Sequence, residues 1–259
     1  MMLDPLQYAL GAGSGALVGF TLGLFGGGGS ILAVPLIVYL VQVPDPHLAI
    51  GTSALAVAVS AAANLANHAR HGHVKWRCGL VFSAAGIFGA LIGSSISKVV
   101  DGQKLLIVFA LLMIAVAVMM LVKRSHTGDA GAQCGVDKMP KVLSYGAMTG
   151  TLSGFFGIGG GFLIVPGLVA STGMPTLYAV GSSLVAVTAF GLTTAFNYAL
   201  SDMVDWPLAA VFILGGVVGG LAGAVAARAL SLRKGALNIA FAGLVFAVAG
   251  YMLFETLVM

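Results

Sequence analysis

Two glycine-rich runs carry the most distinctive chemistry in the sequence. A glycine run followed by a helix start, with Ser30 or Gly161 at the N-cap position, presents unpaired backbone N–H donors and the positive end of a helix dipole. Such donors bind anions. We therefore predict an anion site formed by these residues: Gly26, Gly28, Gly29, Ser30, Gly157, Gly159, Gly160 and Gly161. The alternative is that the glycines only permit tight hairpins or close helix packing.

Hydroxyl and carboxamide side chains form a second group of candidate anion donors. Several positions of one apolar stretch share a helical face, namely Ser53, Ser60, Asn64 and Asn67. Their hydroxyl and amide groups can donate to an anion, or they can hydrogen-bond between helices or back to the i−4 carbonyl. We include Ser53 and Asn67 in the predicted site, together with Ser183 and Asn197 from a second stretch.

Ionisable side chains are absent from the middle of every apolar stretch. All 8 carboxylates and all 12 lysines and arginines lie in loops or at the ends of these stretches. Ionisable groups inside a membrane mark cation sites and proton relays, and hard cations need several oxygen ligands, usually including carboxylates. Cation and metal transport are therefore disfavoured, and no acid, base or metal-ligand set for a membrane enzyme is visible. We predict no cofactor.

The composition identifies the class of protein. Of 259 residues, 59% are hydrophobic and only 8% are charged, whereas soluble domains carry about 25% charged side chains. A soluble globular enzyme is excluded, because so few charges cannot cover the surface and most of the exterior must face lipid. The net charge of +4 comes from residues in short loops, so we expect it to orient the chain in the bilayer rather than to bind nucleic acid.

The chain is a tandem duplication. Residues up to Pro44 recur at an offset of 131, and residues from Gly51 onward recur at an offset of 130 after a one-residue gap. Matching pairs include Gly19 and Gly150, Gly28 and Gly159, Pro35 and Pro166, Ser53 and Ser183, Asn67 and Asn197, and Trp76 and Trp206.

Each half contains one glycine-broken pair of short helices and three stretches long enough to span a bilayer. Residues 11–25 and 30–42 would each be about 20 Å long as helices, too short for a core of about 30 Å. The first repeat, residues 1–124, is predicted to have its broken pair at 11–42 and spans at 48–69, 78–97 and 105–122. A linker at 125–140 leads to the second repeat, 141–259, with a broken pair at 142–172 and spans at 178–199, 207–227 and 235–254.

The positive-inside rule distinguishes two topologies. If each broken pair returns to its starting side, ten basic residues lie inside and two outside, whereas a crossing by each pair gives seven and five. We favour the first arrangement, which makes the linker cytoplasmic and both termini periplasmic. An odd number of crossings per half then inverts the second repeat. The predicted fold is an all-α polytopic membrane protein with two inverted-topology repeats.

Histidines lie at the basic end of the first long span: His68, His71 and His73, beside Arg70 and Lys75. Their spacing suggests a metal, but the neighbouring positive charge opposes one, so we predict no metal site. His68 alone lies near enough to the span to be a proton-coupling candidate. Its counterpart in the second repeat is Tyr198, so such a role would be asymmetric.

The glycine-broken pairs, Gly23 through Pro35 and Gly154 through Pro166, occur together with Gly51-Thr52-Ser53 and Gly181-Ser182-Ser183. In these features the chain resembles the TauE/SafE family of sulfite and organosulfonate exporters, also called the toluene sulfonate uptake permease family. The resemblance covers nearly the whole chain, including the duplication. It implies a permease of the cell inner membrane for small sulfur-containing anions such as sulfite or sulfoacetate. Export rather than uptake follows from the family name alone.

Two other functions remain open on the sequence. One is a permease of the same fold for another small anion, such as a carboxylate, and the other is a non-transporting membrane subunit. The expected partners are a small anionic substrate and the lipid bilayer, with no nucleic acid, and the sequence does not specify an oligomeric state.

Overall fold

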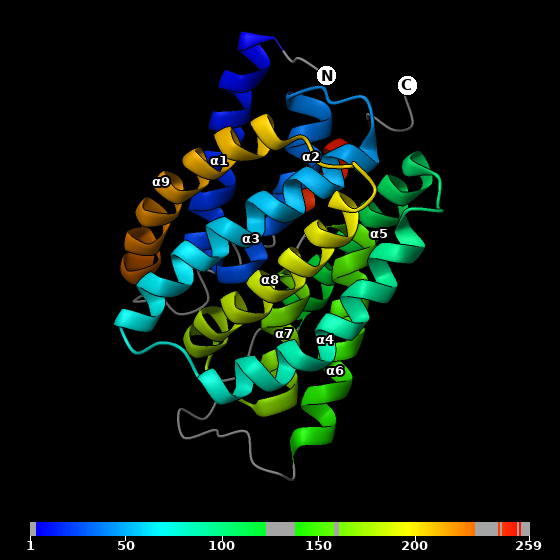
Figure 1. Ribbon diagram of the computed structural model, residues 1–259. Coiled ribbons are helices and arrows are strands. Elements are labelled where there is room, and N and C mark those ends of the chain that lie inside the picture. The colour runs from blue at the N-terminus through cyan, green and yellow to red at the C-terminus, as the bar shows by residue number, and fades with distance from the viewer. Residues whose placement is uncertain are drawn as a thin grey trace.

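The computed structural model describes residues 4–122, 138–157, 161–230, 243, 245–252 and 254. Within these ranges the chain is helical and contains no strand, which confirms the all-α prediction. Figure 1 shows the helices packed side by side in one bundle. Most of the predicted linker 125–140 and half of the predicted span 235–254 lie outside the described residues.

In each half, one long helix and the shorter helical pieces that follow it come before the other long helices. The first half contains α1 (Pro5–Phe25), the 3-10 helix η1 (Gly26–Leu32), α2 (Ala33–Pro35), the π-helical turn η2 (Leu36–Leu40), α3 (Pro46–Arg70), α4 (Trp76–Ser97) and α5 (Gly102–Val122). The second contains α6 (Met139–Phe156), α7 (Gly161–Thr172), α8 (Thr176–Ala199) and α9 (Trp206–Leu230). Both α1 and α6 end at a glycine with positive φ, +65° at Gly26 and +66° at Gly157, where a side chain would be strained.

Each glycine-broken pair folds back so that its two ends meet. Gln7 Nε2, at the start of α1, donates to the carbonyl of Val41, just after η2, at 3.0 Å. Lys138 Nζ, just before α6, donates to the carbonyl of Thr172 at the end of α7 at 2.7 Å. Gln7 matches Lys138 and Val41 matches Thr172 at the offset of 131. Both broken pairs are therefore hairpins, closed by equivalent hydrogen bonds.

Among the described residues, five segments are long and apolar enough to cross a membrane, and mapping them onto the elements above gives four single helices. These are α3, the part of α8 from Tyr178, α4 and the part of α9 to Ala227. The fifth, Pro5–Leu40, qualifies by length and composition, although it contains the turn of the first hairpin. The chain is thus a multi-pass membrane protein.

Glycines bring the backbones of helices from different repeats into contact. A Cβ added at Gly19 of α1 would overlap the carbonyl of Gly216 in α9, and one at Gly150 of α6 would overlap the carbonyl of Gly86 in α4. These two contacts are equivalent under the duplication. Each hairpin therefore packs against a long helix of the other repeat, α1 on α9 and α6 on α4, as Figure 1 shows for the first pair.

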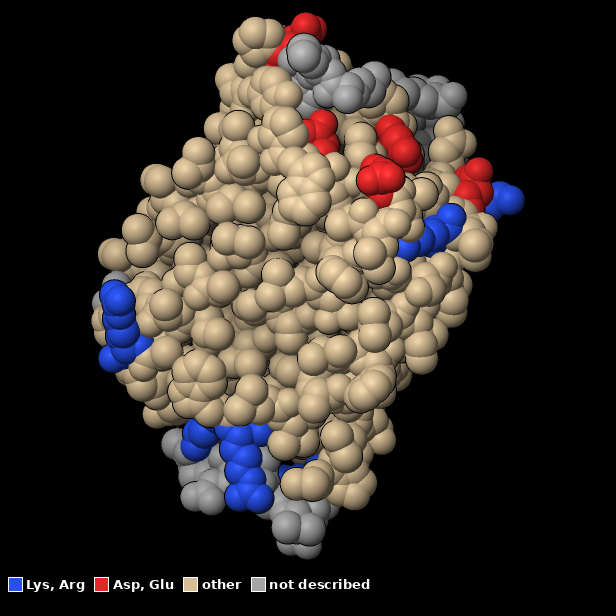
Figure 2. Space-filling view, viewed as in Figure 1, with Lys and Arg blue, Asp and Glu red and all other residues tan. Residues whose placement is uncertain are grey.

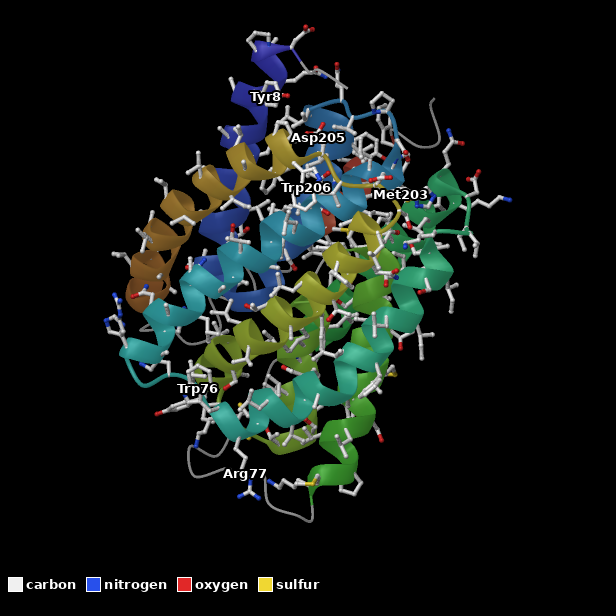
Figure 3. All side chains as sticks on the ribbon, in the orientation of Figure 1. Tyr8, Trp76, Arg77, Met203, Asp205 and Trp206 are labelled. Carbon is white, nitrogen blue, oxygen red and sulfur yellow. The ribbon has the colours of Figure 1, made fainter. Side chains whose placement is uncertain are left out.

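The two ends of the molecule carry opposite charge. On the face drawn in Figure 2, most Lys and Arg side chains gather toward one end and the Asp and Glu side chains toward the other, with a broad uncharged band between them. Figure 3 places Trp76 and Arg77 at the basic end and Asp205 and Trp206 at the acidic end. The equivalent residues Trp76 and Trp206, both at least half exposed, thus lie at opposite ends.

Candidate functional site

We call the glycine-rich turns of the two hairpins the glycine tips. The first is Gly26 to Gly29, and the described residues of the second are Gly157 and Gly161. The two tips meet inside the bundle. A Cβ on Gly161, the first residue of α7, would overlap the carbonyl of Gly27 in η1, and one on Gly27 would lie 2.6 Å from the Gly161 Cα. The tips are therefore in direct backbone contact, with no space for a side chain between them. Every residue of η1 is buried, including Gly28 and Ser30. Gly27 and Gly161, one from each glycine-rich run, thus meet at one enclosed place.

Ser183, on α8, reaches the first tip. Its Oγ accepts a hydrogen bond from the Gly27 N–H at 3.2 Å and donates to the carbonyl of Val180 at 2.7 Å. Ser30 Oγ donates to the Gly27 carbonyl at 2.8 Å. Both backbone groups of Gly27 thus have a serine partner in this conformation.

Ser53, on α3, occupies the equivalent position against the second tip. Its Oγ donates to the carbonyl of Ile50 at 2.9 Å and lies 3.4 Å from the carbonyl of Gly157. Ser53 and Ser183 are both completely buried. Each repeat therefore supplies a serine to the glycine tip of the other repeat.

The residues next to these serines bind the loops at the two ends of the molecule. Thr52 Oγ1 accepts a hydrogen bond from the Asp205 N–H at 2.9 Å, and Ser182 Oγ accepts one from the Lys75 N–H at 2.8 Å. We call these contacts the Asp205 clamp and the Lys75 clamp. The preceding glycines have no room for a side chain either, because Gly51 packs on the carbonyl of Met203 and Gly181 on that of His73. The clamps hold Ser53 and Ser183 beside the tips.

At the tips, the hydrogen bonds of Ser30, Ser53 and Ser183 join only neutral groups. Within the part of the chain that the structure describes, no group of three His, Cys, Asp or Glu side chains is placed to hold a metal ion. The donors at this place are backbone N–H groups and serine hydroxyls, which can stabilise a negatively charged oxygen without a lysine or an arginine.

Two of the predicted site residues, Asn67 and Asn197, lie far from the serines that contact the tips. Ser53 and Asn67 are separated by about 21 Å along α3, and so are Ser183 and Asn197 along α8. Asn197 instead ties α8 to α4, since its Nδ2 donates to Ser94 Oγ at 2.6 Å and its Oδ1 accepts from Lys98 Nζ at 2.9 Å. Burial lowers the pKa of Lys98, which lies just beyond the end of α4.

His68 lies far from the tips, near the basic end of α3, and is 6% exposed. Its ring centroid is 6.2 Å from that of His73, whose N–H donates to the His68 carbonyl at 3.2 Å. Its counterpart Tyr198 is also buried and donates from its hydroxyl to Ser97 Oγ at 2.9 Å. The two equivalent positions thus differ in chemistry, as the repeat alignment indicates.

The remaining predicted glycines divide into two groups. Gly29 packs on the backbone of Thr21 and Leu22, so a Cβ there would disrupt the first hairpin. Gly159 and Gly160 lie outside the described residues. The prediction missed the clamp residues Thr52 and Ser182 as positioning groups. Their position beside Ser53 and Ser183 in equivalent Gly-Thr-Ser and Gly-Ser-Ser triplets is the signal that could have identified them.

Comparison with known proteins matches nearly the whole chain to one family. The family model described as sulfite exporter TauE/SafE matches residues 11–252. A probable membrane transporter protein of Xylella fastidiosa strain Temecula1 is 53% identical over 245 residues, which cover 94% of each chain. The probable membrane transporter protein YunE of Bacillus subtilis is 27% identical over 240 residues, 85% of this chain and 88% of YunE. No solved structure matches.

Proposed function

The chain belongs to the TauE/SafE family of sulfite exporters, and we propose that it exports small sulfur-containing anions such as sulfite or sulfoacetate. Members of this family and the relatives described above are membrane transporters, so the protein is a transporter and not an enzyme. The observation that carries the proposed substrate class is the buried contact between Gly27 and Gly161, which gathers neutral donors from both repeats. A neutral site lined by N–H and hydroxyl donors favours an anion over a cation.

We assign anion binding to the glycine tips and the two serines that touch them. The site consists of Gly26, Gly28, Gly29, Ser30, Ser53, Gly157, Gly159, Gly160, Gly161 and Ser183. Because the Gly27 N–H is bonded to Ser183 Oγ in the enclosed conformation, an entering anion replaces that bond and accepts from both groups. Asn67 and Asn197 lie about 21 Å away along their helices, so the proposed site does not include them.

Transport by this site would follow alternating access in two inverted repeats. The Asp205 clamp and the Lys75 clamp close opposite ends of the site, and opening one at a time would expose it to one side only. We assign the basic end to the cytoplasm, in accordance with the positive-inside rule. This orientation places the N-terminus, which precedes Tyr8 at the acidic end in Figure 3, in the periplasm of an inner membrane. The C-terminus is assigned to the same side.

His68 is the proposed proton-coupling residue, because it is a buried imidazole near the cytoplasmic end of a span. In proteoliposomes, His68→Gln should retain sulfite flux but lose the acceleration that a pH gradient gives the unsubstituted protein. An unchanged response to the gradient in a well-folded variant would assign coupling to the substrate's own proton instead.

The test of the proposed substrate class is efflux from proteoliposomes loaded with sulfite, sulfoacetate or acetate. We expect efflux of sulfite or sulfoacetate, and at least a tenfold lower rate in the Ser53→Ala, Ser183→Ala double variant, since two hydrogen bonds to a charged group are lost. Ser171→Ala is the control, because Ser171 is also buried, at 4% exposed, and its hydroxyl donates to Leu168 of its own helix. Efflux of acetate alone would favour a carboxylate permease, and no efflux of any anion would contradict the proposal.

A further inference from the structure

The buried faces of α3 and α8 differ in the residues that follow Ser53 and Ser183 along each helix. Two turns and three turns beyond Ser53, α3 carries Ser60 and Asn64, which are 1% and 2% exposed. The equivalent residues of α8 are Phe190 and Thr194, both completely buried. The face of α3 runs toward the basic end of the molecule, where α3 ends at Arg70, and that of α8 runs toward the acidic end.

Ser60 and Asn64 face a surface of α9 that has no side chains. A Cβ at Gly216 would overlap Ser60 Oγ, and one at Gly220 would overlap Asn64 Nδ2. Asn64 Nδ2 donates to the Ser60 carbonyl at 3.1 Å, which uses one of its two N–H groups. Ser60 Oγ has no hydrogen-bond partner among the residues that the structure describes. A buried hydroxyl in a membrane interior normally has one, so this donor calls for an explanation.

Aromatic rings fill the equivalent place in the second repeat. The Phe190 ring packs on Gly86, the counterpart of Gly216, and its centroid lies 6.3 Å from that of Phe82. Thr194 also keeps a hydroxyl without a partner within the described ranges. Phe190, however, lies between Thr194 and Ser183 along the same face of α8, so the polar face is interrupted there.

We propose that Ser60 and Asn64 form a second anion subsite on the cytoplasmic half of the pathway. This inference rests on the proposed anion transport and on the proposed orientation. The two side chains are i, i+4 neighbours, close enough for one small oxyanion to accept from the hydroxyl and the amide together. Ser60 and Asn64 lie about 10 Å and 16 Å from Ser53 along α3, so an anion that leaves the glycine tips toward the cytoplasm would reach them next.

The arrangement explains why the donors face glycines. When α3 and α9 separate, no side chain at Gly216 or Gly220 stands between the two donors and an anion. The subsite is neutral, as the tip site is, so an anion held there is not trapped by a fixed positive charge. The second repeat has no equivalent subsite, because Phe190 stands at the position of Ser60. The pathway therefore holds an anion at the tips and at one further place on its cytoplasmic half, with no equivalent place on its periplasmic half.

The test is the apparent KM for sulfite added at the cytoplasmic face of proteoliposomes, measured for Ser60→Ala, Asn64→Thr and the control Thr194→Val. Asn64→Thr introduces the residue that the second repeat has at the same position. Loss of one hydrogen bond to an anion should raise KM about tenfold in each of the first two variants. Thr194→Val should stay within about twofold, since its hydroxyl lies outside the subsite.

Thermal unfolding in sulfite-free detergent identifies any variant that fails to fold. If Asn64→Thr fails to fold, the smaller change Ser60→Ala still tests the subsite. A KM unchanged in folded Ser60→Ala and Asn64→Thr would overturn the subsite, and so would an equal rise in Thr194→Val. Both results leave the transport proposal intact. Only an absence of sulfite flux in the unsubstituted protein would reject the proposed substrate and the subsite together.

Discussion

The Asp205 clamp and the Lys75 clamp are equivalent contacts at ends of opposite charge. Both use a backbone N–H as donor and a side-chain hydroxyl as acceptor. In both, the residue before the hydroxyl residue is a glycine that packs on a backbone carbonyl. The loop residue contributes only its backbone N–H to the clamp, so its side chain can differ between the repeats. The position of Lys75 in the first repeat is accordingly that of Asp205 in the second. Duplication has kept the geometry at both ends, while the charges that orient the protein in a bilayer have diverged.

The largest effect is expected at the glycine interfaces, where the two repeats should respond alike. Gly19→Val and Gly150→Val each drive a side chain into a backbone carbonyl of the opposing helix. We expect each to destabilise the fold by about 3 kcal/mol or more, because backbone on both sides cannot move aside easily. Thermal unfolding of the purified protein measures this.

Gly13→Val serves as the control for these two variants, because a Cβ on Gly13 meets nothing within 4 Å. Its unfolding temperature should stay close to that of the unsubstituted protein. A large loss in only one of Gly19→Val and Gly150→Val would show that the two interfaces are not equivalent in energy.

A smaller effect is expected from removing one clamp hydroxyl at a time. Thr52→Val leaves the Asp205 N–H without its acceptor, and Ser182→Ala does the same to the Lys75 N–H, at a cost of about 1–3 kcal/mol each. If the clamps close opposite ends of the pathway, Thr52→Val should make a cysteine at Ser53 more reactive to a membrane-impermeant thiol reagent from the acidic side.

Ser182→Ala should instead make a cysteine at Ser183 more reactive from the basic side. These labelling measurements use proteoliposomes of known orientation. Equal reactivity from both sides in both variants would mean that the hydroxyls stabilise the fold without gating it.

The smallest effects are expected from the clamp side chains themselves. Lys75→Ala keeps the backbone donor and removes the contact of Nζ with the Tyr178 ring, 5.1 Å from its centroid, so we expect a loss of about 0.5 kcal/mol. Asp205→Ala should cost more, about 1 kcal/mol, because Asp205 Oδ1 also accepts the Leu208 N–H at 3.0 Å as the N-cap of α9. Unfolding temperatures in this order would support clamps made by the backbone, and a larger loss in Lys75→Ala would contradict them.

Much of the fold could be predicted from the sequence, because its strongest signals are periodic. The duplication, the apolar stretches and the glycine breaks each follow from residue type and spacing. Asn67 and Asn197 show the limit, since helical periodicity groups residues by face and says nothing of their depth along the helix. The clamps were missed for another reason: a backbone N–H donor has no residue type, so Lys75 and Asp205 carry no common signal in the sequence.

The central claim is that one anion binds where the tips of the two repeats meet. The most direct measurement is anomalous X-ray diffraction from crystals grown with 2-bromoethanesulfonate, after this compound has been found to compete with sulfite for transport. We predict a bromine peak beside the contact of Gly27 with Gly161, with the sulfonate oxygens within hydrogen-bonding distance of Ser53 or Ser183. A bromine peak elsewhere in the bundle, with the tips still in contact, would contradict the claim.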